Sequence, residues 1–138
     1  TAARIQEVFN TNVVGAFVCA REAAKRMAKK HGGAGGVIVN VSSVAARLGA
    51  AHEYVDYAAS KGALDTMTRS LANSVRPGFI YTDLHADGGE AGRVDRIKTS
   101  LPMQRGGTAE EVAESIAWLL SDKSSYVTGS FIEAAGGR

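Results

Sequence analysis

Two residues with polar tips, Tyr57 and Lys61, lie four positions apart in D-Y-A-A-S-K-G-A, residues 56–63. On a helix, side chains at this spacing share one face. An ammonium beside a phenol favours the phenolate, and so lowers the pKa of the tyrosine from ~10 toward neutrality. The residues between the two are small, so a planar ligand could lie against this face. The pair therefore predicts a group for general acid–base chemistry, although an exposed helical pair has the same spacing.

A second candidate, Ser43, follows an apolar segment. V-I-V-N-V, residues 37–41, is short and rich in β-branched residues on both faces, which is typical of a strand in a parallel sheet covered by helices. Ligands of open parallel α/β sheets bind at the carboxyl ends of the strands. Ser43 would lie there, able to hydrogen-bond the oxygen on which Tyr57 acts. A serine that caps a turn is the alternative interpretation.

Three helices are predicted around these residues. Apolar side chains recur at helical spacing over residues 4–30, with an interruption near Gly15. Good helix formers fill residues 55–72, which carry Tyr57 and Lys61. Thr108 with Glu111 three positions later forms a capping box at the start of a third helix. The buried stripe of this third helix is expected to contain Val112, Ile116, Leu119 and Leu120.

Strands alternate with these helices. Besides residues 37–41, strands are expected at 73–80, ending in a turn at Pro-Gly, and at 126–133. Residues 44–53 are predicted to be a loop, and residues 81–100 a mobile loop or a set of short helices. This alternation indicates an α/β fold with a parallel sheet.

Composition excludes several classes of partner. The chain has 138 residues, 45% of them hydrophobic and 22% charged, which is ordinary for a globular domain. The net charge is +2 without a concentrated basic stripe, so no nucleic-acid partner is expected. No apolar run reaches the length of a membrane span, so we expect no membrane partner and a cytoplasmic protein. The one cysteine, Cys19, lies in an apolar helical stretch, where we expect a buried thiol and neither a disulfide nor a metal site.

Five segments together resemble the short-chain dehydrogenase/reductase family. They are N-T-N-V-V-G-A-F, N-V-S-S, Y-A-A-S-K-G-A, R-P-G-F-I-Y-T and S-S-Y-V-T-G-S-F-I, which span nearly the whole chain. Glucose/ribitol dehydrogenase-like and 3-oxoacyl-reductase-like members look similar to it. The resemblance implies a Rossmann-type, doubly wound parallel sheet. It also implies an NAD or NADP cofactor and hydride transfer that interconverts a secondary alcohol and a ketone.

The resemblance also implies roles for single residues. Tyr57 matches the general acid/base, and Lys61 the lysine that lowers its pKa and holds the nicotinamide ribose. Ser43 matches the serine that orients and polarises the substrate oxygen. Asn12 matches the asparagine that supports a water in the proton relay. The segment that receives the nicotinamide carboxamide is matched by Pro77, Gly78, Ile80 and Thr82.

One departure from the family pattern is small. Ser43 lies fourteen positions before Tyr57, one more than the family pattern leads us to expect. The intervening loop can absorb an extra residue, so Ser43 is preferred to Ser42.

Two departures are larger. The G-x-G-x-x-G turn that binds the pyrophosphate is absent, because G-G-A-G-G, residues 32–36, precedes its strand and is predicted to stop a helix. Residues 1–138 are therefore expected to be the catalytic half of one incomplete Rossmann-type domain. In addition, Ala72 runs directly into Asn73, where the family continues its helix and begins a strand. We expect a longer polypeptide to hold a further segment between residues 72 and 73.

Rival functions remain at this point. The alternative to an oxidoreductase is a non-catalytic binding or scaffolding fragment of the same fold. A hydrolase is disfavoured because no G-x-S-x-G elbow accompanies the histidines. Residues 83–100 would form the lid over the substrate, and their polarity favours a hydroxylated or sugar-like compound. The family also implies a homotetramer or homodimer, with the helix over 55–72 and the last strand at its interfaces.

Overall fold

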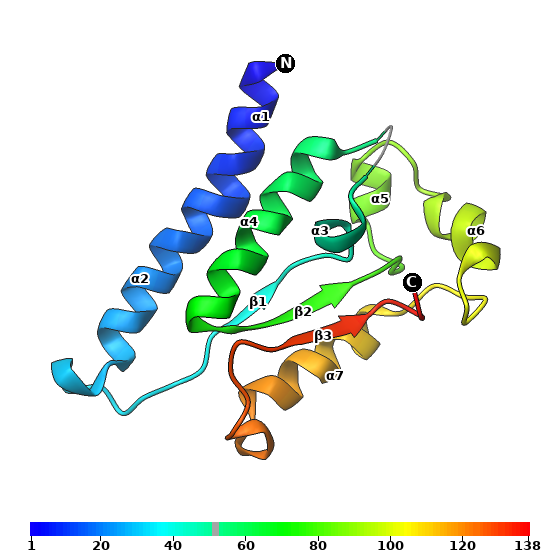
Figure 1. Ribbon diagram of the computed structural model, residues 1–138. Helices are drawn as coiled ribbons and strands as arrows, with labels where there is room; N and C mark the ends of the chain where they lie inside the picture. The colour runs from blue at the N-terminus through cyan, green and yellow to red at the C-terminus, as the bar shows by residue number, and fades with distance from the viewer. Residues whose placement is uncertain (51–52) are drawn as a thin grey trace.

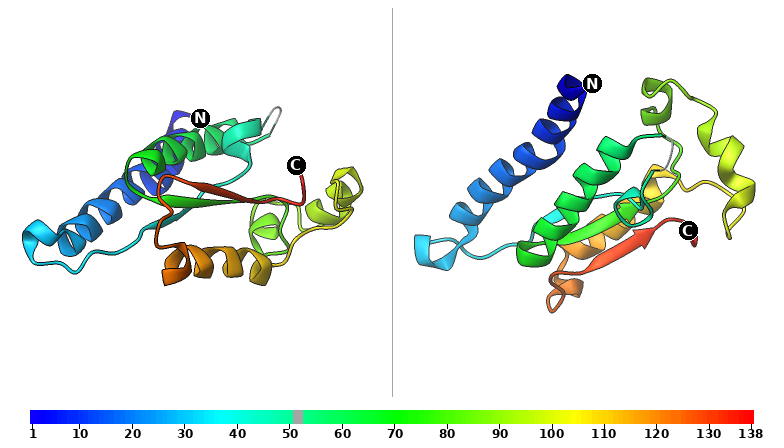
Figure 2. Two further views of the ribbon diagram at one scale, coloured as in Figure 1. Left: turned by 60° about the horizontal axis from the view of Figure 1, so that its bottom comes forward. Right: turned by 45° about the horizontal axis from the view of Figure 1, so that its top comes forward.

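The computed structural model describes residues 1–50 and 53–138. Its centre is a parallel sheet in the order β1-β2-β3, built from Val39–Val41, Asn73–Pro77 and Phe131–Ala134. Helices α1, α2 and α4 lie over one face of the sheet, and α7 lies over the other (Figures 1 and 2). This layered α/β arrangement with a parallel sheet confirms the predicted fold class, of which the chain holds a part.

The remaining elements complete the chain between these strands. Their bounds are α1 Ala2–Phe9, η1 Asn10–Gly15, α2 Ala16–Met27, η2 Lys29–His31, α3 Ala45–Leu48, α4 Val55–Leu71, α5 Leu84–Asp87, α6 Arg93–Ile97, η3 Lys98–Ser100, α7 Ala109–Leu120 and η4 Asp122–Ser124. The predicted helix over residues 4–30 is thus α1, η1 and α2 in succession. The predicted interruption is a π-helical segment, a conformation that occurs mostly as single turns inside α-helices and frequently at functional sites.

Two apolar clusters hold the layers together. Val75, Ile80, Val112 and Leu119 are buried between the sheet and α7. Ala20, Leu64 and Met67 are buried where α2 packs on α4. The capping box of Thr108 and Glu111 starts α7 as predicted. Gly32, with φ of 85°, ends the turn after η2, where an L-residue would be strained.

Several sequence predictions need correction. Leu120 is 55% exposed, because it lies about 100° around the helix from Leu119, which faces the sheet. Cys19 is exposed for the same reason, since its neighbour Ala20 holds the buried side of α2. The last strand begins only at Phe131, because a turn in which Val127 N–H donates to the Ser124 carbonyl precedes it.

The structure also differs from two other predicted element boundaries. The first strand starts at Val39, because its ladder with β2 begins there at Asn73. Within the predicted loop 44–53, residues 45–48 form the short helix α3. Residues 81–100 contain α5, α6 and η3, in agreement with the prediction of short helices. No helix in the described ranges has the length and hydropathy required to cross a membrane.

Candidate active site

Ser43 lies just beyond the carboxyl end of β1. Ser42 N–H donates to the Val75 carbonyl at 2.8 Å and Val44 N–H to the Pro77 carbonyl at 3.1 Å, so the chain keeps its register with β2 on either side of Ser43. The Ser43 hydroxyl oxygen accepts a hydrogen bond from Ala45 N–H at 3.2 Å. This capping contact uses the oxygen as an acceptor, and so leaves the hydroxyl proton available for another partner.

Tyr57 and Lys61 lie on one face of α4, as their spacing predicts. The Lys61 Nζ is 5.6 Å from the centroid of the Tyr57 ring. The same Nζ donates a hydrogen bond to the Val41 carbonyl at 2.8 Å, which draws the side chain to the end of β1. The Tyr57 hydroxyl interacts with the Ser43 side chain. The structure therefore brings Ser43, Tyr57 and Lys61 together at the carboxyl edge of the sheet.

Burial dominates the electrostatics of this pair. It raises the pKa of Tyr57, and the hydrogen bond with Ser43 opposes this rise. Burial also lowers the pKa of Lys61, while the negative charge of Asp65 raises it in part. A lowered pKa of Tyr57, expected from the neighbouring ammonium, is therefore not what this structure shows. The physical reason is that a half-buried phenolate loses more hydration than its neighbours replace.

Asn12 is connected to Tyr57 by two hydrogen bonds through Ser60. It lies in the π-helical segment η1, and its Nδ2 donates to the Ser60 hydroxyl at 3.0 Å. Ser60, which is 0% exposed, donates in turn to the carbonyl of Tyr57 at 2.7 Å. Asn12 is thus tied to the helical turn that carries Tyr57. Sequence reasoning treated Ser60 only as a small residue, although a serine on the buried side of this helix requires a polar partner.

The segment expected to receive the nicotinamide follows β2 at the same edge. Gly78 N–H donates to the Ala134 carbonyl at 3.0 Å, and a Cβ at Gly78 would lie 2.8 Å from the Ala135 Cα. Ile80 is 9% exposed and packs in the core against α7, so its side chain is turned away from the crevice. Thr82 is exposed, which leaves its hydroxyl accessible.

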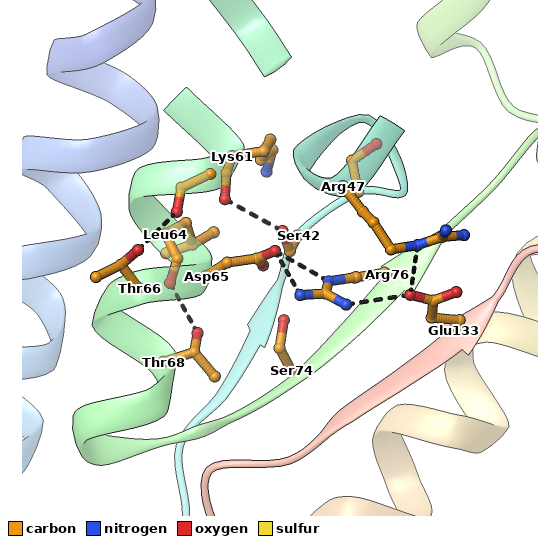
Figure 3. Close-up of polar contacts among 12 residues, drawn as sticks. Ser42, Arg47, Lys61, Leu64, Asp65, Thr66, Thr68, Ser74, Arg76 and Glu133 are labelled. Atoms are coloured by element: carbon orange, nitrogen blue, oxygen red, sulfur yellow. Dashed lines mark hydrogen bonds and ion pairs between the residues drawn. The ribbon is translucent and has the colours of Figure 1, made fainter. Parts of the chain in front are cut away.

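A chain of charged side chains lies beneath the site, and sequence reasoning missed it. Arg76 on β2 binds Asp65 on α4 at 2.7 Å and Glu133 on β3 at 3.1 Å. Glu133 also binds Arg47 on α3 at 3.0 Å (Figure 3). These partners are far apart in sequence, and no local pattern connects them.

Residues 81–100 are fastened beside the start of α4. The Tyr54 hydroxyl donates to the Gly88 carbonyl at 2.9 Å, and Arg93 forms an ion pair with Glu53. The Arg93 guanidinium lies 5.4 Å from the centroid of the Tyr54 ring. The short helices α5 and α6 are therefore held next to the residues that precede Tyr57.

Known proteins are similar to this chain over its whole length. The model of a family described as enoyl-(acyl carrier protein) reductase matches residues 1–138. An uncharacterized oxidoreductase, YgfF, of Escherichia coli (strain K12) is 66% identical over 148 positions, covering 100% of this chain and 60% of the relative. A glucose and ribitol dehydrogenase homolog of Oryza sativa subsp. japonica is 36% identical, over 96% of this chain and 48% of the relative. The chain belongs to the short-chain dehydrogenase/reductase family.

Solved structures are similar over nearly the whole chain. A xylitol dehydrogenase with NAD⁺ bound superposes with a TM-score of 0.87 at 25% identity, over 99% of this chain and 61% of its own. An ElxO variant with NADPH bound gives 0.83 at 27% identity, over 99% and 58%. This chain thus spans only about 50–60% of the proteins that it matches. The YgfF alignment has 148 positions against 138 residues here, so ten of its positions have no counterpart in this chain.

Proposed function

We propose that this chain is the catalytic part of an NAD(P)-dependent oxidoreductase that interconverts a secondary alcohol and a ketone. The observation that supports this most directly is the meeting of Ser43, Tyr57 and Lys61 where parallel strands end. Ligands of such sheets bind at this edge. A non-catalytic binding or scaffolding fragment of the same fold is the alternative, and the experiment below decides between them.

Each side chain has a role that its contacts support. Tyr57 would give a proton to the substrate oxygen in reduction and take it back in oxidation. With substrate bound, the hydroxyl proton of Ser43 would turn from Tyr57 to the same substrate oxygen, where it stabilises developing negative charge. Lys61 would stabilise the phenolate form of Tyr57. Asn12 would support a water of the proton relay, from a π-helical turn that Ser60 holds against α4.

A nicotinamide cofactor, NAD or NADP, supplies the hydride when it is bound. Lys61 has an ammonium near the surface of the crevice that can bind ribose hydroxyls. Pro77, Gly78, Ile80 and Thr82 would receive the carboxamide, mainly through their backbone and the Thr82 hydroxyl. The fit is supported by the exposed hydroxyl of Thr82 at this edge of the sheet, whereas glycine at position 78 is accounted for by close packing on Ala135. Ile80 would contribute only its backbone, since its side chain is in the core.

The substrate class we propose is a hydroxylated or sugar-like compound. This proposal is supported by the polarity of residues 83–100. A hydrogen bond from Tyr54 to the Gly88 carbonyl holds this segment beside the N-terminus of α4. The relatives named after glucose, ribitol and xylitol agree with such a substrate. We also propose a homotetramer or homodimer in the cytoplasm, with α4 and β3 at the interfaces.

We propose as well that a longer polypeptide holds a segment between Ala72 and Asn73. Only Ala72 separates α4 from β2, whereas connections between a helix and a strand usually have 2–6 residues. The positions of YgfF without counterpart provide an independent reason to expect additional residues.

The test is nicotinamide absorbance with sugars, polyols and ketones, using the intact protein and each cofactor in turn. We expect turnover with one of the cofactors, and a loss of at least ~100-fold in kcat for Tyr57→Phe, because the proton donor is removed. Cofactor binding, measured by fluorescence, should persist in this variant. Turnover that survives Tyr57→Phe would refute the assigned role, and cofactor binding without any turnover would favour the scaffolding fragment.

A further inference from the structure

Asp65 is a buried carboxylate one helical turn after Lys61. Its side chain is among the least exposed of the charged ones, since the residue is 4% exposed. Its Oδ2 accepts hydrogen bonds from Arg76, at 2.9 Å from Nε and 2.7 Å from Nη2. Its Oδ1 is buried and has no hydrogen-bond partner among the residues that the structure describes. A buried charge is costly unless it is compensated, so this carboxylate requires an explanation.

Arg76 forms an ion pair with a second carboxylate besides Asp65. Its Nη1 donates to Glu133 at 3.1 Å, and its guanidinium stacks 4.0 Å from the centroid of the Phe131 ring. Glu133 accepts a further ion pair from Arg47 at 3.0 Å. Arg76 is therefore shared between two carboxylates, of which Glu133 has a second arginine partner. Among the described residues Asp65 has Arg76 as its one ion-pair partner, and its Oδ1 is left without a hydrogen bond. The next cation along α4 is Lys61, at the spacing that places two side chains on one face (Figure 3).

Lys61 is a partly buried cation that the negative charge of Asp65 would stabilise. Its ammonium lies in a partly buried place, where Nζ donates a hydrogen bond to a neutral acceptor, the Val41 carbonyl, and to no other group of residues 1–50 and 53–138. Burial lowers the pKa of Lys61, and the carboxylate of Asp65 raises it. The role proposed for Lys61 depends on its positive charge, because a neutral amine would not stabilise a phenolate.

Other charged groups around the pair are already engaged. On α4, Asp56 binds Arg4 of α1 at 2.7 Å, and Arg69 stacks over Phe131. From β2, β3 and α3 come Arg76, Glu133 and Arg47, described above. From β1, the group that faces Lys61 is the uncharged carbonyl of Val41.

We propose that Asp65 is a positioning residue of the active site, which keeps Lys61 in its ammonium form while Arg76 holds the carboxylate in place. This inference rests on the proposed function, since it concerns the partner of the general acid/base. It differs from a purely structural clamp between α4 and β2. A clamp needs hydrogen bonds between Asp65 and Arg76, whereas the proposed role needs the negative charge of Asp65.

Asp65→Asn distinguishes the positioning role from the structural clamp, because asparagine keeps the shape and an acceptor oxygen but removes the charge. The readout is the pKa of Lys61 by NMR of ¹³C,¹⁵N-labelled lysine in the intact protein without cofactor, with the signal assigned by its loss in Lys61→Arg. We expect this pKa to fall by about one unit or more in Asp65→Asn. Asp56→Asn is the matched control, since it removes a carboxylate of the same helix that is paired with Arg4, and we expect a much smaller change.

A second variant covers the case in which Asp65→Asn does not fold. Glu133 is exposed, and Glu133→Gln removes the carboxylate that competes with Asp65 for Arg76. Arg76 would then neutralise Asp65 more completely, so the pKa of Lys61 should fall in the same direction by a smaller amount. An unchanged pKa of Lys61 in the folded variants would overturn the proposal. Asp65 would then have only the structural role of connecting α4 to β2 through Arg76.

Kinetics give an independent readout in the intact enzyme. We expect Asp65→Asn to lower kcat about tenfold more than it changes KM, and Asp65→Glu to restore part of the loss. Equal kcat in Asp65→Asn and the wild type would count against the proposal. The failure of the proposed function looks different, because it would abolish turnover in the wild type and leave the NMR titration of Lys61 intact.

Discussion

Asn12 and Ser60 join two helices at the candidate active site by one hydrogen bond of 3.0 Å, from the amide of Asn12 to the hydroxyl of Ser60. The Ser60 hydroxyl in turn donates a hydrogen bond to the carbonyl of Tyr57 at 2.7 Å. A π-helical turn is rarely stable by itself, so a contact from its centre helps to define its position. The contact also fixes the turn of α4 on which Tyr57 stands.

Ser60→Ala should therefore destabilise the protein. The variant leaves the Asn12 amide without its partner in a part-buried place and removes a hydrogen bond to Tyr57. We expect a loss of about 1–3 kcal/mol in the free energy of unfolding, measured by urea denaturation. Ser70→Ala, at an exposed position of the same helix, is the control and should change this free energy by less than about 0.5 kcal/mol. Equal costs in the two variants would show that the Asn12–Ser60 contact contributes little.

The pH dependence of catalysis should follow the state of Tyr57. Burial raises the pKa of Tyr57, so the phenol is protonated at neutral pH. Oxidation of an alcohol needs a group that accepts a proton, whereas reduction of a ketone needs one that donates it. We therefore expect the oxidation rate of the intact enzyme to rise with pH up to about pH 10, and the reduction rate to begin to fall only above about pH 10. Initial rates in both directions, measured at saturating substrate, would contradict this if both followed the same trend.

Local patterns in the sequence were sufficient for some of this architecture. The spacing of Tyr57 and Lys61 placed both on one face of a helix, and the Thr108–Glu111 capping box located the start of α7. Such features depend on residues a few positions apart, where helix geometry alone decides the contact. The position of Ser43 at a strand end followed from the apolar run before it.

Contacts between distant residues could not be predicted in this way. Arg76 binds a partner eleven positions away on α4 and another on β3, and these contacts exist only because parallel strands bring the elements together. The expected effect of Lys61 on the pKa of Tyr57 failed for a related reason. The degree of burial of a side chain depends on the packing of the whole fold, which the Y-x-x-x-K spacing does not contain.

Glu111 should make stability depend on pH below neutrality. Its carboxylate accepts from Arg105 at 2.6 and 2.8 Å and from Thr108 N–H at 2.9 Å, and these contacts lower its pKa from 4.5 to about 2. Because the pKa is lower in the folded state, the stabilisation is complete above about pH 4.5 and is lost as pH falls toward 2. Glu111→Gln should therefore lower Tm near pH 7, and the difference from the wild type should shrink below about pH 4.5.

Differential scanning calorimetry over this pH range checks the prediction for Glu111. Glu114→Gln, at an exposed position further along α7, is the control and should leave Tm nearly unchanged. A Tm difference for Glu111→Gln that is the same at pH 3 as at pH 7, or about so, would contradict the assignment of the effect to the ionised carboxylate.

Gly78 and Gly62 should respond to alanine in opposite ways. A Cβ at Gly78 would lie 2.8 Å from the Ala135 Cα, so Gly78→Ala must push β3 away from the turn after β2. We expect a loss of about 1–3 kcal/mol in the free energy of unfolding and weaker cofactor binding. A Cβ at Gly62 would meet nothing within 4 Å, and alanine in a helix interior is favoured over glycine by roughly 0.5–1 kcal/mol. If Gly78→Ala were as stable as Gly62→Ala, close packing at this turn would not be what requires glycine.

The junction of Ala72 and Asn73 can be tested on the protein isolated from its source. Trypsin cleaves after Arg69 and Arg93 but poorly at Arg76, which precedes proline, so a continuous chain gives one peptide over residues 70–93. We expect instead a peptide in which additional residues follow Ala72, about ten if the segment corresponds to the unmatched positions of YgfF. These residues would extend α4 beyond Leu71 and lengthen the connection to β2, which now consists of one residue. Tandem mass spectrometry that finds Ala72 bonded directly to Asn73 in this peptide would establish the short connection as native. The helix that carries Tyr57 and Lys61 would then be tied to the sheet more tightly than a connection of usual length allows.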